Sequence, residues 1–192
     1  MNFENPLISG LFVKRYKRFF VDINIDNKIV TAHCANTGSM FGLLNKNNKV
    51  WLTESNNKKR KLKYTLQIIE NDKSKVGVNT HLTNKIVNHA LENNFIEGFS
   101  SKVKIKREQA FGENTRFDFY LEDKKIKSFL EVKNVTLKRK SKIAEFPDSV
   151  TSRGTKHLNE LINATKKGFN AYLLFLVQRE DCNKFEIAKD ID

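Results

Sequence analysis

The sequence predicts an α+β protein in which a small antiparallel barrel or sheet is followed by a mixed α/β region. Short segments of alternating apolar and polar residues, bounded by turn residues, fill the first 78 positions. From residue 79 onward, apolar residues at helical spacing alternate with apolar strand-like runs in the order α-β-β-β-α-β. We therefore predict two domains, comprising residues 1–78 and 79–192.

The first region contains about five predicted strands. FFVDINID and IVTAHC have the pattern of a hairpin with its turn at Asn27-Lys28. KVWLTE and KYTLQIIE follow as two further strands, separated by the polar segment SNNKKRK. Strands this short, with turns at close intervals, are typical of a small barrel.

The second region begins with a predicted helix over residues 80–93, followed by the strand-like segments VKIKRE, RFDFYLE and KSFLEVKNVTL. A second helix is predicted over residues 151–167, because Leu158, Leu161 and Ile162 share one face and Gly168 ends the pattern. The following run AYLLFLVQ is apolar at consecutive positions, which predicts a central strand covered on both faces.

Composition favours a polyanionic partner. The chain has 35 basic and 22 acidic side chains, a net charge of +13, and nucleic acid is the leading candidate, ahead of a ribosomal surface or an anionic membrane. Its two cysteines, Cys34 and Cys182, cannot build a disulfide framework or a zinc knuckle, so we expect a reducing cytoplasm. No apolar run approaches the roughly 20 residues of a membrane-spanning helix, and no signal peptide is expected at the N-terminus.

Asp118, Glu131 and Lys133 lie within the apolar strands of the stretch RFDFYLEDKKIKSFLEVKNV, where a carboxylate must recover its lost hydration from a partner. A hairpin centred between Lys124 and Lys125 pairs residues whose numbers sum to 249, which places Asp118 opposite Glu131. Strand alternation puts Lys133 on the same face as Glu131. A divalent cation such as Mg²⁺ would remove the repulsion between the two acids and would activate water for attack on a phosphate.

The spacing acid-x-Lys is weak evidence by itself, because it occurs four times in the chain. Only the Glu131 to Lys133 pair lies in an apolar strand with an acid opposite it, whereas the other three pairs lie in turns. From these features alone a metal site and a simple ion pair or solvated strand edge both remain open.

Several longer motifs carry a resemblance. RFDF, LEVKNVTL and FPDSVTSRGTKHLNEL, with the earlier HCANTGSM and VGVNTHL, resemble the sugar fermentation stimulation protein A (SfsA) family over nearly the whole chain. The resemblance implies an N-terminal OB-like β-barrel, a following PD-(D/E)XK nuclease-like mixed sheet flanked by helices, and sequence-independent DNA binding. It also implies that the chain of a family member usually continues beyond FEIAKDID.

By its position in the sequence, Asp118 would be the aspartate of the family's PD motif. Glu131 and Lys133 would be the acid and the lysine of the (D/E)XK motif. Asp118 and Glu131 would hold Mg²⁺ or Mn²⁺, and Lys133 would act on the attacking water. Residue 117 is Phe rather than Pro, and the helix before the core lacks the glutamate that many such nucleases supply, a place that Asn84 would take. Gln178 is a further candidate catalytic residue, with the satisfaction of a buried backbone group as the alternative. For His157 we favour the surface of a helix over a phosphate contact.

We assign DNA binding to two basic segments. In the first segment, basic residues alternate with aromatic residues, as in a strand whose cations contact phosphates and whose rings stack on bases. The alternative is a core strand with one face exposed to solvent. The second is a loop, for which a solvated charge run is equally compatible. The assigned residues are Lys14, Arg15, Lys17 and Arg18 in the first segment and Lys58, Lys59, Arg60 and Lys61 in the second.

Two functions therefore remain. The first is a sequence-independent DNA-binding protein with a Mg²⁺-dependent nuclease site, acting as endonuclease or exonuclease. The second is a DNA-binding regulator of sugar metabolism without nuclease activity. An RNA-associated basic protein is a third interpretation, and the sequence does not decide between a monomer and a homo-oligomer.

Overall fold

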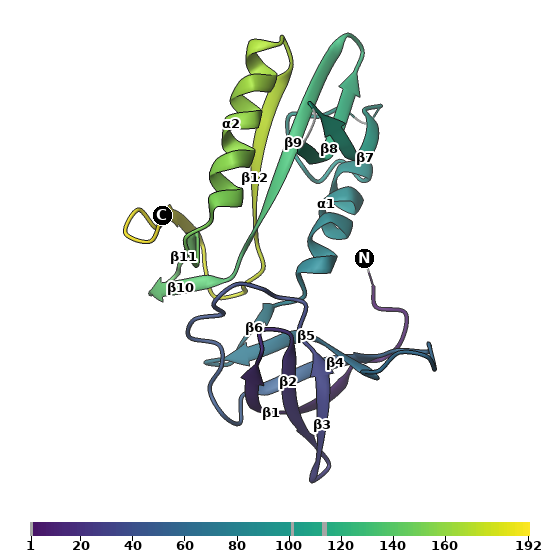
Figure 1. Ribbon diagram of the computed structural model, residues 1–192, viewed down its shortest axis with the longest axis vertical. Helices are drawn as coiled ribbons and strands as arrows, with labels where there is room; N and C mark the ends of the chain where they lie inside the picture. Colours follow the sequence, from purple (N-terminus) through teal and green to yellow (C-terminus); the bar gives the residue numbers. More distant parts are fainter. Residues whose placement is uncertain (1, 101, 113–114) are drawn as a thin grey trace. The chain divides into compact units, whose positions relative to one another are not determined.

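The computed structural model describes residues 2–100, 102–112 and 115–192, which form two compact units (Figure 1). The first unit comprises the chain through His81 together with Val135–Ser149 and Val177–Asp192, and the second comprises Leu82–Asn134 and Val150–Leu176. The chain therefore passes between the units four times. The boundary predicted after residue 78 lies close to the first crossing, but two later segments of the predicted second domain belong to the first unit.

The first unit contains a closed barrel. Its strands follow the order β3-β2-β1-β4-β5-β6, and β3 also pairs in parallel with β5, which closes β1 to β5 into a five-stranded barrel of the OB type. The predicted fold of this region is confirmed. The strands are β1 (Ile8–Tyr16), β2 (Phe20–Ile25), β3 (Lys28–His33), β4 (Lys49–Glu54), β5 (Tyr64–Asn71) and β6 (Ser74–Gly77).

Alternation of apolar and polar residues builds the barrel core. Val21 and Ile23 of β2, and Val50 and Leu52 of β4, are fully buried, while the residues between them face outward. The hairpin joining β2 to β3 turns at Asp26 and Asn27, both with positive φ, one residue earlier than predicted. Asp and Asn tolerate this left-handed conformation better than lysine does, which favours a turn at Asp26 and Asn27 over one at Asn27 and Lys28.

The second unit consists of a four-stranded sheet and two helices. The sheet order is β12-β9-β8-β7, with β7, β8 and β9 successively antiparallel. A single 3-10 turn (Thr80–Leu82) precedes the first helix. The elements are α1 (Thr83–Glu92), β7 (Lys104–Phe111), β8 (Thr115–Asp123), β9 (Ile126–Val135), α2 (Ser152–Lys166) and β12 (Asn170–Val177).

Two apolar clusters fix these helices to the sheet. Val87 and Leu91 of α1 are buried in one cluster with strand residues such as Phe119. Leu161 and Ala164 of α2 are buried in the other, together with Phe111, Phe117 and Phe129. At roughly 1.5–3 kcal/mol for each large side chain, such burial supplies much of the free energy that positions the helices.

The strand β12 corrects one prediction. Its apolar run predicted a central strand covered on both faces, but β12 lies at the edge of the sheet and none of its residues is fully buried, with Tyr172 39% exposed. Both faces are nevertheless partly covered, since Leu174 and Leu176 pack against one apolar cluster and Ala171 and Leu173 pack against the other. A run of apolar residues indicates that a strand can be buried, but it does not indicate where the strand lies in the sheet. Strand order, which depends on contacts distant in sequence, decides whether the strand is central or at the edge.

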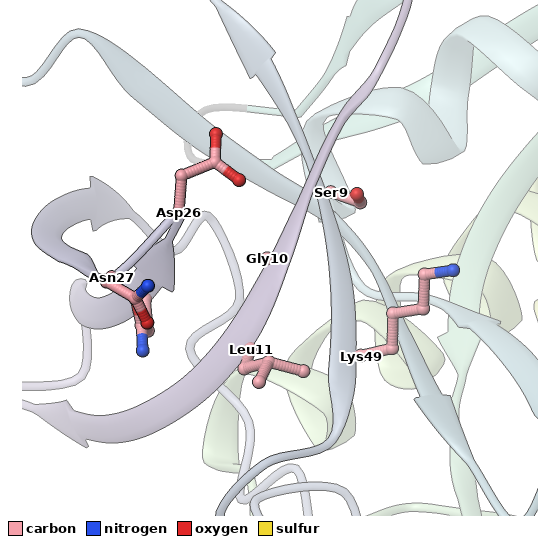
Figure 2. A pocket seen from close by; sticks show the side chains of 7 residues that line it. Ser9, Gly10, Leu11, Asp26, Asn27 and Lys49 are labelled. Atoms are coloured by element: carbon pink, nitrogen blue, oxygen red, sulfur yellow. The ribbon is translucent and has the colours of Figure 1, made fainter.

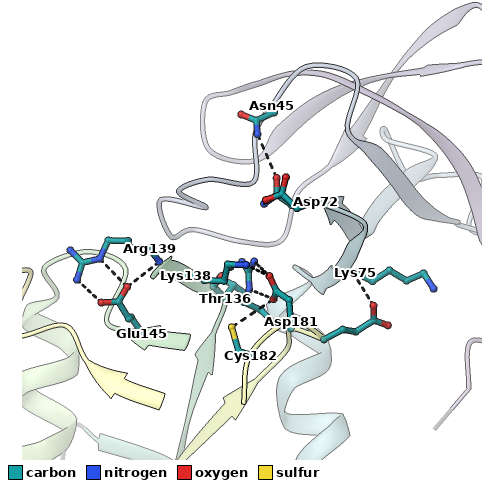
Figure 3. Close-up of polar contacts among 12 residues, drawn as sticks. Asn45, Asp72, Lys75, Thr136, Lys138, Arg139, Glu145, Asp181 and Cys182 are labelled. Atoms are coloured by element: carbon teal, nitrogen blue, oxygen red, sulfur yellow. Dashed lines mark hydrogen bonds and ion pairs between the residues drawn. The ribbon is translucent and has the colours of Figure 1, made fainter. Parts of the chain in front are cut away.

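A small third sheet was not predicted. It joins β10 (Leu137–Lys140), β11 (Ile143–Phe146) and β13 (Lys184–Ile187) in the first unit, with β11 and β13 parallel. Ion pairs between Arg139 and Glu145 and between Arg179 and Asp181 lie in this part of the unit, and Figure 3 shows the surrounding polar contacts. The strands have only four residues each, too few for periodicity to reveal them. None of the helices in the described part of the chain is long and apolar enough to cross a membrane.

Candidate functional site

The hairpin of β8 and β9 brings two acids together. Its register runs from Phe119↔Leu130 to Asp123↔Ile126, so the predicted sum of 249 is confirmed. One residue beyond the last pair, Asp118 accepts a 2.8 Å hydrogen bond at Oδ2 from the backbone N–H of Val132. The carboxylates of Asp118 and Glu131 are close enough for their repulsion to affect the pKa of Asp118.

Asp118 is held from two sides. Besides the Val132 N–H, the amide Nδ2 of Asn84 in α1 donates a 2.7 Å hydrogen bond to Oδ1. Burial raises the pKa of Asp118 above its ordinary value of 3.8, and the charge of Glu131 raises it further, while the two hydrogen bonds act in the opposite direction. A bound cation would stabilise the ionised form that burial and Glu131 disfavour.

Glu131 is the most buried acid of this group, with 3% of its surface exposed. Its Oε1 accepts a 2.9 Å hydrogen bond from Nζ of Lys133 and also contacts Nδ1 of His157. Its Oε2 is buried and has no hydrogen-bond partner among the described residues. A buried carboxylate oxygen left unpaired is costly, so its presence indicates a missing partner.

His157 corrects our prediction of a helix-surface residue, since its side chain is only 12% exposed and touches Glu131. The sequence did contain the signal for this position. In α2, His157 precedes the buried Leu161 by four residues and the buried Ala164 by seven, which places the three on one helix face. A similar helical spacing, three and seven residues, relates Asn84 to the buried Val87 and Leu91 in α1.

Gln178 belongs to the first unit, whereas Asp118, Glu131 and Lys133 belong to the second. It follows β12 directly, at the point where the chain returns to the first unit. There its N–H donates to the carbonyl of Val135 and its own carbonyl accepts from the N–H of Gly77. A Cβ at Gly77 would lie 2.6 Å from Oε1 of Gln178, so this glycine leaves room for the Gln178 side chain. Both hydrogen bonds are made by the Gln178 backbone, so the catalytic role of its side chain and the alternative both stay predictions.

The first basic segment is not a single strand. β1 ends at Tyr16, and Lys17 and Arg18 form a tight turn with positive φ at both residues. Lys14 is exposed and lies 3.6 Å from Asp22. The guanidinium of Arg15 instead donates hydrogen bonds to the carbonyls of Asn36 at 2.7 Å and Gly38 at 3.0 Å, so Arg15 supports the loop after β3.

The second basic segment, Lys58–Lys61, is an exposed loop between β4 and β5. Its Arg60 donates a 2.8 Å hydrogen bond to Oγ1 of Thr65. Thr65 pairs with His33, and His33 pairs with Phe20, two residues after Arg18. The strand register therefore places the two basic segments at the same end of the barrel.

The acids of the second unit suit a hard cation. Within residues 2–100, 102–112 and 115–192, no group of three or more His, Cys, Asp and Glu side chains could hold a metal ion. Mg²⁺ does not require such a group, because it binds through one or two carboxylates and retains water and substrate phosphate as its other ligands. Asp118 and Glu131, with the unpaired Oε2, fit that requirement.

Two family models match the chain. Residues 81–192 match the family model described as the sugar fermentation stimulation protein RE domain, and residues 13–78 match the SfsA N-terminal OB domain. The chain belongs to the SfsA family. The sugar fermentation stimulation protein homolog of Pelagibacter ubique is 57% identical over the whole chain, which covers 83% of that relative. The homolog of Brucella anthropi is 44% identical, and the whole chain covers 84% of it.

A solved structure of the family has the same fold. The structure of Pyrococcus furiosus SfsA in complex with Ca²⁺ superposes with a TM-score of 0.89 at 27% sequence identity. The match covers all of this chain and 81% of the Pyrococcus chain.

Proposed function

We propose that this protein binds DNA without sequence preference and hydrolyses its phosphodiester bonds at a Mg²⁺-dependent site of the PD-(D/E)XK type. The observation that carries the proposal is the buried Glu131 carboxylate, whose Oε2 has no hydrogen-bond partner in the described part of the chain. It lies beside a second acid, Asp118, whose pKa is raised by burial and by Glu131. Perturbed acids of this kind are concentrated at functional sites.

Each residue has a distinct role in this proposal. Asp118 and Glu131 are the metal ligands, and the bound metal would supply Lewis-acid activation of water and charge neutralisation at the phosphate. Asn84 and the Val132 N–H orient Asp118, and His157 orients Glu131. Lys133, whose ammonium lies 2.9 Å from Glu131 Oε1, orients the attacking water and offsets negative charge on the phosphate.

The Pyrococcus relative supports the choice of cation. That protein was solved in complex with Ca²⁺, which like Mg²⁺ is a hard cation that prefers oxygen ligands. We extend this preference to the two acids of the present chain. Ca²⁺ often fills a Mg²⁺ site without supporting its chemistry, so Ca²⁺ is a useful inhibitor in the assays below.

DNA binding rests on the barrel and the charge. A net charge of +13 is suited to phosphate neutralisation, which releases counterions and needs no contact with base edges. The exposed residues Lys14, Lys17 and Arg18 and the Lys58–Lys61 loop lie at one end of an OB barrel, a fold that commonly binds nucleic acid.

A DNA-binding regulator of sugar metabolism without nuclease activity is the second candidate. It is favoured by Asn84, whose neutral amide lies against Asp118 where many nucleases supply a glutamate. The name of the family, sugar fermentation stimulation protein, also favours a regulatory role.

A cleavage assay separates the two candidates. Purified protein is incubated with labelled single-stranded and duplex DNA in Mg²⁺, Mn²⁺, Ca²⁺ or EDTA. The nuclease proposal predicts product with Mg²⁺ or Mn²⁺ and none with Ca²⁺ or EDTA. DNA binding without product in every condition would favour the regulator.

A further inference from the structure

Trp51, the single tryptophan of the chain, makes cation–π contacts with two lysines on the outer surface of the barrel. Nζ of Lys49 is 5.2 Å from the centre of the indole ring, and Nζ of Lys75 is 5.8 Å from it. Trp51 is half-buried, whereas both lysines are exposed. Both ammonium groups lie over the indole ring, so a base that stacks on the ring takes the place of an ammonium group, which then neutralises an adjoining phosphate.

The strand register defines the surface around this ring. Val50 and Leu52 point into the barrel core, so Trp51 points outward between them. On either side it pairs with Ser9 of β1 and Ile68 of β5. Trp51 therefore stands in the middle of a three-strand face rather than at an edge.

A pocket of about 380 Å³ adjoins Trp51 (Figure 2). Leu11 of β1 pairs with Asn24 on one side and with Lys49 on the other, and all three line the pocket. Asp26 and Asn27 reach it from the β2–β3 turn, and Figure 2 shows them across β1 from Lys49. Because Lys49 borders both features, the pocket and the tryptophan form one continuous surface.

The pocket offers hydrogen-bonding groups of both kinds. The amides of Asn24 and Asn27 donate and accept, and the Asp26 carboxylate accepts. Oδ1 of Asn24 is buried and has no hydrogen-bond partner among the described residues. A carboxylate repels phosphate but accepts from the amino and imino groups of bases, so the pocket matches a base edge and the lysines match the backbone.

We propose that this surface, which we call the Trp51 platform (Trp51, Lys49, Lys75 and the adjoining pocket), binds single-stranded DNA. One base stacks on Trp51, Lys49 and Lys75 contact the flanking phosphates, and a neighbouring base enters the pocket. The proposal rests on the DNA-binding function proposed above and specifies its substrate. A duplex hides the faces of its bases, so the platform requires unpaired bases.

The single tryptophan provides a direct test. The full chain is titrated with an oligothymidine of about 12 nucleotides, within the range that one OB fold covers. Binding is followed by fluorescence anisotropy of a label on the DNA and by the intrinsic emission of Trp51. We expect quenching of the emission to coincide with the anisotropy change, and weaker binding of a duplex of the same length.

Variants test the two interactions separately. Trp51→Ala should weaken binding of single-stranded DNA roughly 5- to 150-fold, and Trp51→Phe should retain part of the affinity because its ring still stacks. Lys49→Ala should reduce the magnitude of the slope of log affinity against log salt by about 0.7, the value for one phosphate contact with a single strand. Lys28→Ala, an exposed lysine outside the platform, is the matched control and should bind as wild type does.

The readouts distinguish failure of the platform from failure of DNA binding. If anisotropy shows binding but the Trp51 emission does not change, the platform is wrong while the proposed function stands, and this result does not depend on whether Trp51→Ala folds. No anisotropy change with any DNA would overturn the proposed function and the platform together. Tighter binding of duplex DNA, or of oligouridine RNA, would also overturn the platform.

Discussion

The carboxylate of Asp118 accepts one hydrogen bond from a helix and one from the neighbouring strand, 2.7 Å from Nδ2 of Asn84 and 2.8 Å from the backbone N–H of Val132. Both donors stabilise the ionised carboxylate, yet burial and the charge of Glu131 still raise its pKa. The protein therefore orients the Asp118 carboxylate but does not fully compensate its negative charge, as is expected of a metal ligand in the absence of the metal.

Removing a ligand should abolish cleavage and preserve binding. Asp118→Asn, or Lys133→Ala, should reduce any Mg²⁺- or Mn²⁺-dependent DNA cleavage to the background level, because metal ligation and water orientation act along the reaction path. Asp118→Asn should also tighten DNA binding without metal, since it removes a negative charge near the scissile phosphate. Cleavage assays and anisotropy titrations measure the two effects.

Asp118→Asn is a well-matched substitution at this position. An asparagine offers one acceptor instead of two, but rotation of the Asn84 amide restores a complementary pair while the Val132 N–H keeps its acceptor. If the wild type cuts no DNA with either metal, and the variant binds DNA as the wild type does with and without metal, the nuclease proposal fails.

Metal binding should stabilise the wild-type protein at neutral pH. The pKa of Asp118 is raised in the folded state, so the folded state holds this proton more tightly, and stability falls as pH rises from the ordinary value of 3.8 through the raised pKa. At pH 7 the ionised acid destabilises the fold. Mg²⁺ at a concentration about 100-fold above its Kd should add about 2.7 kcal/mol to the free energy of unfolding.

Thermal melts at pH 7 and pH 4 measure this effect. The stabilisation by Mg²⁺ should be smaller at pH 4, where protons compete for Asp118, and should be lost in Asp118→Asn. That variant should also melt at a higher temperature than the metal-free wild type at pH 7. Equal shifts in wild type and variant would assign Mg²⁺ binding to some other site.

DNA affinity should depend steeply on salt. If the basic end of the barrel contacts about four phosphates of a duplex, log affinity should fall with log salt at a slope of about −3 to −4. Reversing the charges of Lys14, Lys17 and Arg18 together should weaken binding to all sequences and reduce the magnitude of the slope by up to about 3, while leaving Mg²⁺ stabilisation intact. An affinity insensitive to salt would contradict the assignment.

Arg15 should behave differently from its basic neighbours. Its guanidinium is occupied by the carbonyls of Asn36 and Gly38, so Arg15→Ala removes support from the loop after β3. We expect a loss of about 1–3 kcal/mol in the free energy of unfolding, measured in urea. If the variant were as stable as wild type but bound DNA much more weakly, Arg15 would be assigned to DNA binding rather than to support of the loop.

The ion pairs of the first unit should make it sensitive to acid. Arg179 is buried and donates to Asp181 at 2.9 and 3.0 Å, and Lys138 also contacts Asp181 (Figure 3). These cations hold the pKa of Asp181 far below its ordinary value of 3.8. A lowered pKa stabilises the fold above pH 3.8, and this stabilisation is lost as pH falls below that value.

Asp181→Asn tests this pair. Its removal leaves the Arg179 guanidinium buried without its charge partner, which should cost about 3–5 kcal/mol at pH 7. The difference between wild type and variant should narrow as the pH is lowered from 4 to 2. Urea midpoints measured over this range check the trend, and a constant difference would show that the pKa of Asp181 is the same in the folded and unfolded states.

The sequence by itself determined the local geometry of the candidate site. Strand alternation and a tight turn between Lys124 and Lys125 were sufficient to set the β8–β9 register and to place Lys133 on the face of Glu131. These relationships depend on residues close in the chain, for which the backbone offers few conformations. The β2–β3 hairpin of the barrel was predictable for the same reason, apart from a one-residue shift of its turn to Asp26 and Asn27.

Only the tertiary structure decided which distant residues complete the site. Asn84 reaches Asp118 across 34 residues and His157 reaches Glu131 across 26, while Gln178 belongs to the other unit. The same holds for the edge position of β12 and for Lys75 beside Trp51. Contacts between distant segments depend on which helix faces and strand edges bury together, and that choice is made by packing of the whole chain rather than by any local pattern.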